Sequence, residues 1–95
     1  MKVSSVLAFT HDYSREFGGK KRLHKHYTTL IDGNPLINFS IKWDYSRPDI
    51  YMIDTCIQDK DGSYIFIDCK SRKEAHKWIA ENRQRILDEA NNRSH

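Results

Sequence analysis

The chain has 95 residues, which is enough for one small domain and too few for separate catalytic and substrate domains. Apolar residues make up 38% and aromatic residues 12%, a composition that supports a hydrophobic core and differs from that of a disordered chain. The formal net charge of +3 makes the chain mildly basic. This charge permits a nucleic acid or an acidic protein as partner without selecting either one.

The sequence predicts a cytoplasmic protein that does not act at a membrane. It contains no apolar run close to the roughly 20 residues that a membrane-spanning helix needs. The apolar stretch before His11 and Asp12 is too short for a signal peptide. We expect no cofactor and no metal, because the spaced pair His24 and His26 lacks the further ligands of a tetrahedral zinc shell.

The first half of the chain predicts three strands. Residues 3–10 form a short apolar strand, and residues 12–26 form a basic loop at the tip of a ribbon. Residues 26–45 predict a hairpin whose turn is residues 32–35. Apolar side chains alternate along its second strand, which indicates a half-buried strand: Ile37, Phe39, Ile41, Trp43 and Tyr45.

Residues 51–70 predict a further hairpin, with Lys60-Asp61-Gly62 as a type I turn followed by a left-handed glycine. Placing Asp59 opposite Ser63 fixes the register of the whole hairpin. In that register Cys56 faces Phe66, Asp54 faces Asp68, and Met52 faces Lys70. Cys69 then lies on the face opposite Cys56, so a disulfide between them is not expected.

The alternation of side chains sorts this hairpin into two faces. The apolar face must be buried, and it comprises Tyr51, Ile53, Thr55, Ile57, Ile65, Ile67 and Cys69. The other face mixes polar groups with aromatic rings, and it comprises Met52, Asp54, Cys56, Gln58, Tyr64, Phe66, Asp68 and Lys70. The second face is the candidate functional surface.

A C-terminal helix over residues 72–91 would cover the apolar face. Ser71 and Glu74 have the spacing of a capping box, and an apolar stripe follows at helical intervals: Ala75, Trp78, Ile79, Asn82, Ile86 and Ala90. The sequence therefore predicts an α+β fold in one domain, residues 1–95. It is an antiparallel sheet of four to five strands with one C-terminal helix packed on one face.

The motif "PD…DCK" in residues 48–70 resembles the signature of the PD-(D/E)xK nuclease superfamily. The resemblance implies a metal-dependent nuclease in which Asp49 and Asp68 hold Mg²⁺ and Lys70 stabilises developing charge. The predicted register makes Asp54 the better metal partner of Asp68. In the alternative, non-catalytic interpretation, Asp54, Asp68 and Lys70 are a surface charge cluster.

Residues 62–83, "GSYIFIDCKSRKEAHKWIAENR", resemble the end of the small DNA-binding domain at the amino terminus of phage-type tyrosine integrases. That resemblance implies that Tyr64, Phe66 and Lys70 belong to a surface that reads DNA. Asp54 and Asp68 depart from this pattern, because carboxylates on the same face repel phosphate.

A basic cluster of Lys20, Lys21, Arg22 and Lys25 is the third candidate site, since it could contact phosphates or an acidic surface. We interpret the chain as a small non-enzymatic binding protein, like the inhibitors of host machines that phages and mobile elements make. Its partner would be a host protein or a protein–nucleic-acid complex, bound through the basic cluster, Tyr64, Phe66 and Lys70. A nucleic-acid-binding domain and a nuclease are the alternatives, and the oligomeric state stays open.

Overall fold

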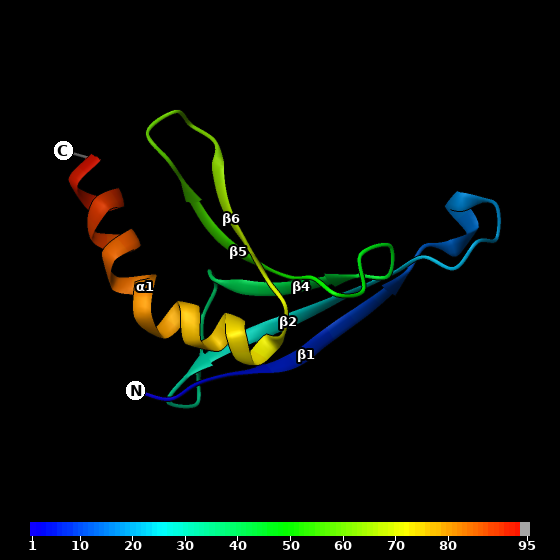
Figure 1. The fold of residues 1–95 in the computed structure, drawn as a ribbon, viewed down its shortest axis with the longest axis horizontal. Helices are drawn as coiled ribbons and strands as arrows, with labels where there is room; N and C mark the ends of the chain where they lie inside the picture. The colour runs from blue at the N-terminus through cyan, green and yellow to red at the C-terminus, as the bar shows by residue number, and fades with distance from the viewer. Residues whose placement is uncertain (94–95) are drawn as a thin grey trace.

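The computed structural model describes residues 1–93. An antiparallel sheet occupies most of the chain, and helix α1 follows it (Figure 1). The elements in chain order are β1 (Val3–Asp12), the short 3-10 helix η1 (Ser14–Phe17), β2 (Leu23–Ile31), β3 (Asn34–Pro35), β4 (Ser40–Asp44), β5 (Tyr51–Gln58), β6 (Tyr64–Cys69) and α1 (Arg72–Arg93).

The strands lie in the order β1-β2-β4-β5-β6, all pairs are antiparallel, and the two-residue β3 pairs with β2. Helix α1 packs against β1, β5 and β6 on one face, which confirms the predicted α+β fold. The N-terminus and helix α1 lie toward one end of the molecule, and the connection between β1 and β2 lies at the other end (Figure 1). No helix within residues 1–93 is long and apolar enough to cross a membrane.

The predicted cap starts helix α1. The N–H of Glu74 donates to Ser71 Oγ at 3.0 Å, which satisfies one of the free donors of the first turn. The Glu74 carboxylate in turn accepts the N–H of Lys70 at 2.9 Å, one residue earlier than a regular capping box. The helix runs to Arg93, two residues past its predicted end.

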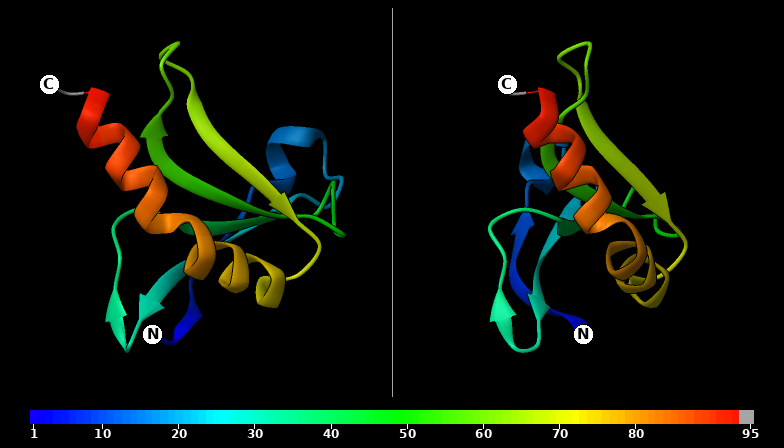
Figure 2. Two further views of the ribbon diagram at one scale, coloured as in Figure 1. Left: turned by 60° about the vertical axis from the view of Figure 1, so that its left-hand side comes forward. Right: turned by 90° about the vertical axis from the view of Figure 1, so that its left-hand side faces the viewer.

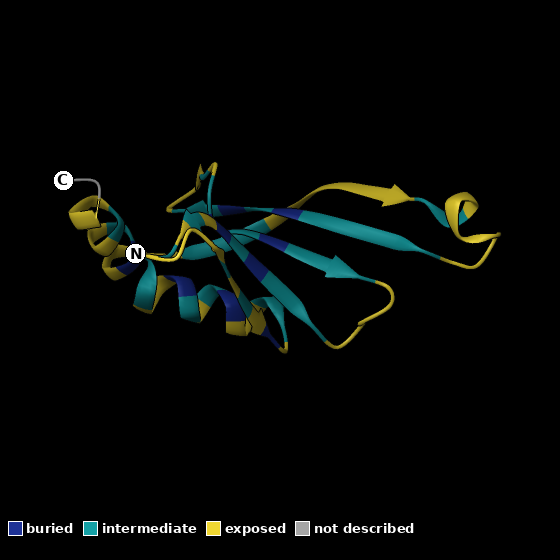
Figure 3. Cartoon of the chain, turned by 90° about the horizontal axis from the view of Figure 1, so that it is seen from above, coloured by how far each residue is buried: buried dark blue, intermediate teal, exposed yellow. Residues whose placement is uncertain are grey.

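The core lies between α1 and the centre of the sheet, where Phe39, Ile41, Ile53 and Ile79 are fully buried. The hydroxyls of two buried threonines donate hydrogen bonds to backbone carbonyls. Thr29 donates to Phe39 O, and Thr55 donates to Ile65 O. The predicted helix stripe is confirmed at Ala75, Ile79 and Ile86, which are buried, while Trp78 is half-buried at the border of the core. Figure 3 shows that burial is concentrated in the central strands and in the face of α1 that meets them.

The register predicted for the β5–β6 hairpin is wrong beyond the turn. Near the turn it holds, because Asp59 N–H donates to Ser63 O and Gly62 takes a φ of +85°. Beyond it, Asp54 faces Phe66 and Met52 faces Asp68. The predicted pairs Cys56 with Phe66, Asp54 with Asp68 and Met52 with Lys70 therefore do not form.

A bulge in β5 causes this shift. Between its paired residues β5 advances from Asp54 to Gln58, whereas β6 advances only from Phe66 to Tyr64. Within the bulge Cys56 adopts a φ of +57°, and its N–H donates to Asp54 Oδ1 at 3.0 Å. Because the register moves by two residues, every side chain keeps its predicted face. Cys56 is exposed, Cys69 is buried, and both are free thiols.

The first half of the chain departs from prediction at three points. Asp32 and Gly33, with φ of 49° and 83°, form a two-residue turn, so residues 34–35 begin the returning strand β3. The next strand begins at Ser40 because the chain leaves the sheet after Pro35, and Ile37 is fully exposed in that excursion. The basic loop is shorter than residues 12–26, because pairing of β1 with β2 continues to Asp12 and Leu23.

Two isoleucine substitutions test this core. Ile79→Ala should lower the free energy of unfolding by about 2 to 5 kcal/mol, since it leaves a cavity at a fully buried position. The matched change Ile37→Ala, at a fully exposed position, should stay within about 0.5 kcal/mol of wild type. Urea unfolding followed by circular dichroism measures both, and equal costs would contradict the observed packing.

Candidate functional site

Strands β1 and β2 form a long two-stranded ribbon, and its tip, residues 13–22, is a structured connection between them. Asp12 Oδ1 accepts hydrogen bonds from the N–H and the hydroxyl of Ser14, and these bonds hold the pKa of the Asp12 carboxyl below its usual value. The N–H of Tyr13 donates to Arg22 O at 3.0 Å, which closes the base of the tip. The tip therefore presents its side chains on a defined backbone.

Three cations of the ribbon lie over aromatic rings. The Arg22 guanidinium carbon is 4.7 Å from the Phe17 ring centroid, and Lys21 Nζ is 5.0 Å from that of Tyr45. Farther along β2, Lys25 Nζ is 5.1 Å from the Trp43 ring. The electrostatic attraction between each cation and the face of its ring holds the charge in position, and it leaves the other side of the cation open to an anion.

A shallow groove runs across the tip between these groups. It is lined by Phe17, Lys20, Lys21, Arg22, Tyr45 and Ser46. Phe17 is 46% exposed and Tyr45 is 41% exposed, so aromatic surface alternates with cationic surface in the groove. A surface of this composition can bind an anionic group and a flat or apolar group side by side.

Charge is distributed unevenly over the molecule. Residues 11–26 contain five Lys and Arg residues, two Asp and Glu residues and three histidines. Residues 51–70, the β5–β6 hairpin, contain four Asp and two Lys residues. Helix α1, which packs beside this hairpin, contains six Lys and Arg residues and four Asp and Glu residues and so offsets the hairpin's negative charge. The ribbon is therefore the part of the molecule with the clearest excess of positive charge, which attracts an anionic partner.

The open face, defined as the sheet face opposite α1, carries a row of rings near the ribbon. A shift in the pairing of β1 after Leu7 brings Phe9 opposite His26, and their rings stack with centroids 4.3 Å apart. Next in the row, Tyr13 Oη and His24 Nε2 are 2.6 Å apart. The sequence gives no sign of this row, because its formation depends on the shift in the pairing of β1.

His24 also contacts Asp44, with 3.1 Å between Nε2 and Oδ2, and this contact is an ion pair when the imidazole is protonated. Burial acts to raise the pKa of the Asp44 carboxyl, but hydrogen bonds from Ser46 and His24 outweigh burial and lower it. For His26 burial is the largest effect and lowers the pKa, and the nearby charges of Lys42 and His24 act in the same direction. His26 is therefore held neutral to a lower pH than a free imidazole.

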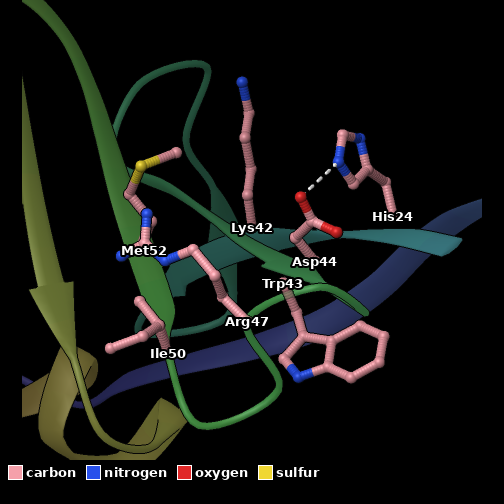
Figure 4. Close-up of a pocket in the computed structure, with 7 residues that line it drawn as sticks. All are labelled: His24, Lys42, Trp43, Asp44, Arg47, Ile50 and Met52. Atoms are coloured by element: carbon pink, nitrogen blue, oxygen red, sulfur yellow. Dashed lines mark ion pairs between the residues drawn. The ribbon is translucent and has the colours of Figure 1, made fainter. Parts of the chain in front are cut away.

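Figure 4 shows the pocket beside this row, with the His24–Asp44 pair at its border. It is lined by His24, Lys42, Trp43, Asp44, Arg47, Ile50 and Met52. Its volume is about 90 Å³. Ligand pockets for small molecules usually enclose roughly 300 to 1,000 Å³, so this pocket suits a single side chain of a partner better than a metabolite.

The residues of the nuclease-like motif are not assembled around one position. Asp54 pairs with Lys42 at 2.8 Å, and Asp68 pairs with Arg47 at 2.9 Å. Asp49 is exposed in the connection between β4 and β5, and Lys70 is exposed after the end of β6. Within the described part of the chain, no three His, Cys, Asp or Glu side chains form a group that could hold a metal ion.

Asp54 and Asp68 each have a cation of their own. Burial would raise the pKa of Asp54, but the ion pair with Lys42 and the N–H of Cys56 outweigh it and lower the pKa. A carboxylate that is neutralised by a neighbouring lysine repels phosphate only weakly. The acidic groups of the open face therefore oppose an anionic partner less than their number suggests.

The predicted binding residues form two separate groups. The basic cluster lies on the ribbon, where Lys25 points to the side of the sheet that carries Trp43. Tyr64 and Phe66 lie on β6 and are 57% and 49% exposed. Together with Asp54 and Cys56 they line a shallow cleft on the open face, and Lys70 follows at the end of the strand.

Comparison of the chain with protein-family models, with curated proteins and with solved structures finds no match. The groups that stand out are the cationic and aromatic ribbon tip, the ring row of the open face, and the exposed aromatics of β6.

The histidines predict a pH dependence of stability. Burial lowers the pKa of His26, and burial followed by the Arg72 charge lowers that of His76. The unfolded state, with a histidine pKa of about 6.5, then binds protons before the folded state does, so stability falls as the pH drops below about 6.5.

The double variant His26→Gln with His76→Gln removes these two groups. Its melting temperature should fall less than that of wild type between pH 7.5 and pH 5.5, as measured by thermal unfolding. An equally steep fall in the double variant would show that other groups cause the dependence.

Proposed function

We propose that this chain is a non-enzymatic binding protein that contacts an acidic partner through the ribbon tip and the adjacent open face. The observation that carries the proposal is the tip, where Lys21 and Arg22 lie over exposed rings and share one groove with Lys20. Interfaces are enriched in aromatic residues and arginine, which this groove combines.

The shape of the molecule supports this use. The tip lies at the end of the ribbon farthest from α1, and it is exposed (Figure 3). A partner can therefore cover it without disturbing the core. Its backbone hydrogen bonds and cation–ring contacts restrict its side chains before binding, which lowers the entropy lost on association.

We infer that the partner is a protein or a protein–nucleic-acid complex with an acidic surface. The positive charge of the ribbon favours its approach to an acidic surface, because opposite potentials steer encounter. The 90 Å³ pocket next to the tip could accept one side chain of such a partner. A small inhibitor or modulator of a host machine, as phages and mobile elements encode, is the biological role that fits this arrangement.

Direct binding of nucleic acid is the second candidate. The groove places cations beside exposed rings, and single-stranded nucleic acids bind proteins by pairing phosphates with cations and stacking bases on rings. The ion pairs of Asp54 with Lys42 and Asp68 with Arg47 reduce the repulsion that these carboxylates would otherwise exert. The nuclease-like motif stays a prediction, and the proposal made here is carried by the ribbon tip, since Asp54 and Asp68 each pair with a cation of their own.

Charge removal at the ribbon tests the proposal. Replacing Lys20, Lys21, Arg22 and Lys25 with Ser should weaken partner binding by at least about tenfold and flatten its salt dependence, since steering and ion pairs are lost together. Pull-down of the partner from lysate of the native host, followed by titration in increasing salt, measures both effects.

The matched control removes the same charge elsewhere. Lys60, Lys73, Lys77 and Arg85 are exposed residues of the hairpin turn and of α1, and their replacement with Ser should leave binding close to wild type. Equal losses in the two variants would mean that only net charge matters and that the tip is not the contact.

Nuclease treatment of the lysate separates the two candidates. A partner retained after treatment is a protein, and loss of every partner together with binding of a labelled oligothymidine identifies nucleic acid. Failure of the tip variant to alter either kind of binding would refute the proposed surface.

A further inference from the structure

Strand β6 forms one border of the sheet. It pairs with β5 on one side, and no described strand lies on its other side (Figure 2). In an antiparallel ladder, successive residues direct their N–H and C=O groups alternately to the two sides of the strand. Half of the β6 backbone therefore points away from the sheet.

The observed bonds identify which half. Ser63 O accepts the N–H of Asp59, and Ile65 O accepts the Thr55 hydroxyl, so these two residues face β5. The alternate residues Tyr64, Phe66 and Asp68 must then direct their donors and acceptors to the free side. The row ends at Lys70, whose N–H donates to Glu74.

The side chains along this edge favour pairing with another strand. Tyr64 and Phe66 are 57% and 49% exposed, and residues 63–67 carry no charge. Natural edge strands usually avoid pairing by means of bulges, prolines or charged side chains. None of these interrupts β6 between Tyr64 and Ile67, because the bulge of this hairpin lies in β5.

The opposite edge, strand β1, is protected by comparison. Arg72 reaches over it and approaches Ser5 O and Ser5 Oγ at 3.5 and 3.3 Å. The pairing of β1 also shifts between Leu7 and Phe9, which breaks the regular repeat that a second strand would need. Strand β6 is therefore the edge that is open to a continuous ladder.

We propose that β6 pairs antiparallel with β6 of a second copy of this chain, with Phe66 at the two-fold axis. This register opposes the outward-facing residues of both strands, since Tyr64 of each copy then faces Asp68 of the other. No two like charges face each other, and the two exposed Phe66 rings meet at the centre. A self-complementary strand satisfies the requirement for a closed two-fold interface.

The dimer would extend the sheet across both copies and present two ribbon tips from one particle. Two tips can bind a partner that carries repeated acidic sites more tightly than one tip can, without any new contact. The dimer itself does not depend on the function proposed for the tip, so either proposal can fail alone.

Sedimentation equilibrium of the purified wild-type chain tests the proposal. The mass should rise from monomer to dimer with protein concentration, and Phe66→Lys should remain monomeric, because it places two like charges at the axis. Phe9→Lys, an equally exposed phenylalanine of β1, is the matched control and should still form the dimer. Circular dichroism shows that each variant is folded.

A cross-link tests the register. In a Cys56→Ser background, Phe66→Cys should form a disulfide-linked dimer under mild oxidation. In the proposed register, residue 66 of one copy lies opposite residue 66 of the other, within the distance that a disulfide can span. A wild type that stays monomeric at every concentration, or a dimer abolished by Phe9→Lys and retained in Phe66→Lys, would overturn the proposal.

Discussion

The packing of α1 against one face of the sheet determines which surfaces of the molecule are buried and which stay exposed. Ile79 of the helix and Ile41 and Ile53 of the central strands are fully buried, and they belong to one core cluster. A chain of this length buries a limited core, so the other face of the sheet stays in contact with solvent. The surfaces available for binding follow from this one-sided burial.

The exposed surfaces divide by charge and by position. At the ribbon end, Arg22 and Lys21 lie over Phe17 and Tyr45, while at the hairpin end Asp54 and Asp68 are each held by a cation. A partner that binds the ribbon and a copy that binds β6 would occupy different parts of the molecule. One small chain can therefore combine recognition with self-association.

The sequence was sufficient to predict the features that local chemistry determines. Ser71 and Glu74 marked the start of the helix, Gly62 marked the hairpin turn, and the alternation in residues 51–70 separated the buried face from the open face. The features that the sequence did not reveal depend on tertiary contacts. The β5 bulge rests on Asp54 accepting the N–H of Cys56, and the ring row rests on a shift in β1. Neither leaves a periodic signal, so the pairing of Asp54 with Asp68 was predicted in error, and the stacking of Phe9 on His26 was not predicted.

Hydrogen–deuterium exchange of the chain, alone and saturated with its captured partner, locates the binding surface. We expect the partner to slow exchange in residues 13–26 and to leave the amides of α1 unchanged, because recognition takes place at the ribbon and the helix serves only the core. Slower exchange confined to α1, with the ribbon unaffected, would place the binding surface on the helix and refute recognition by the ribbon.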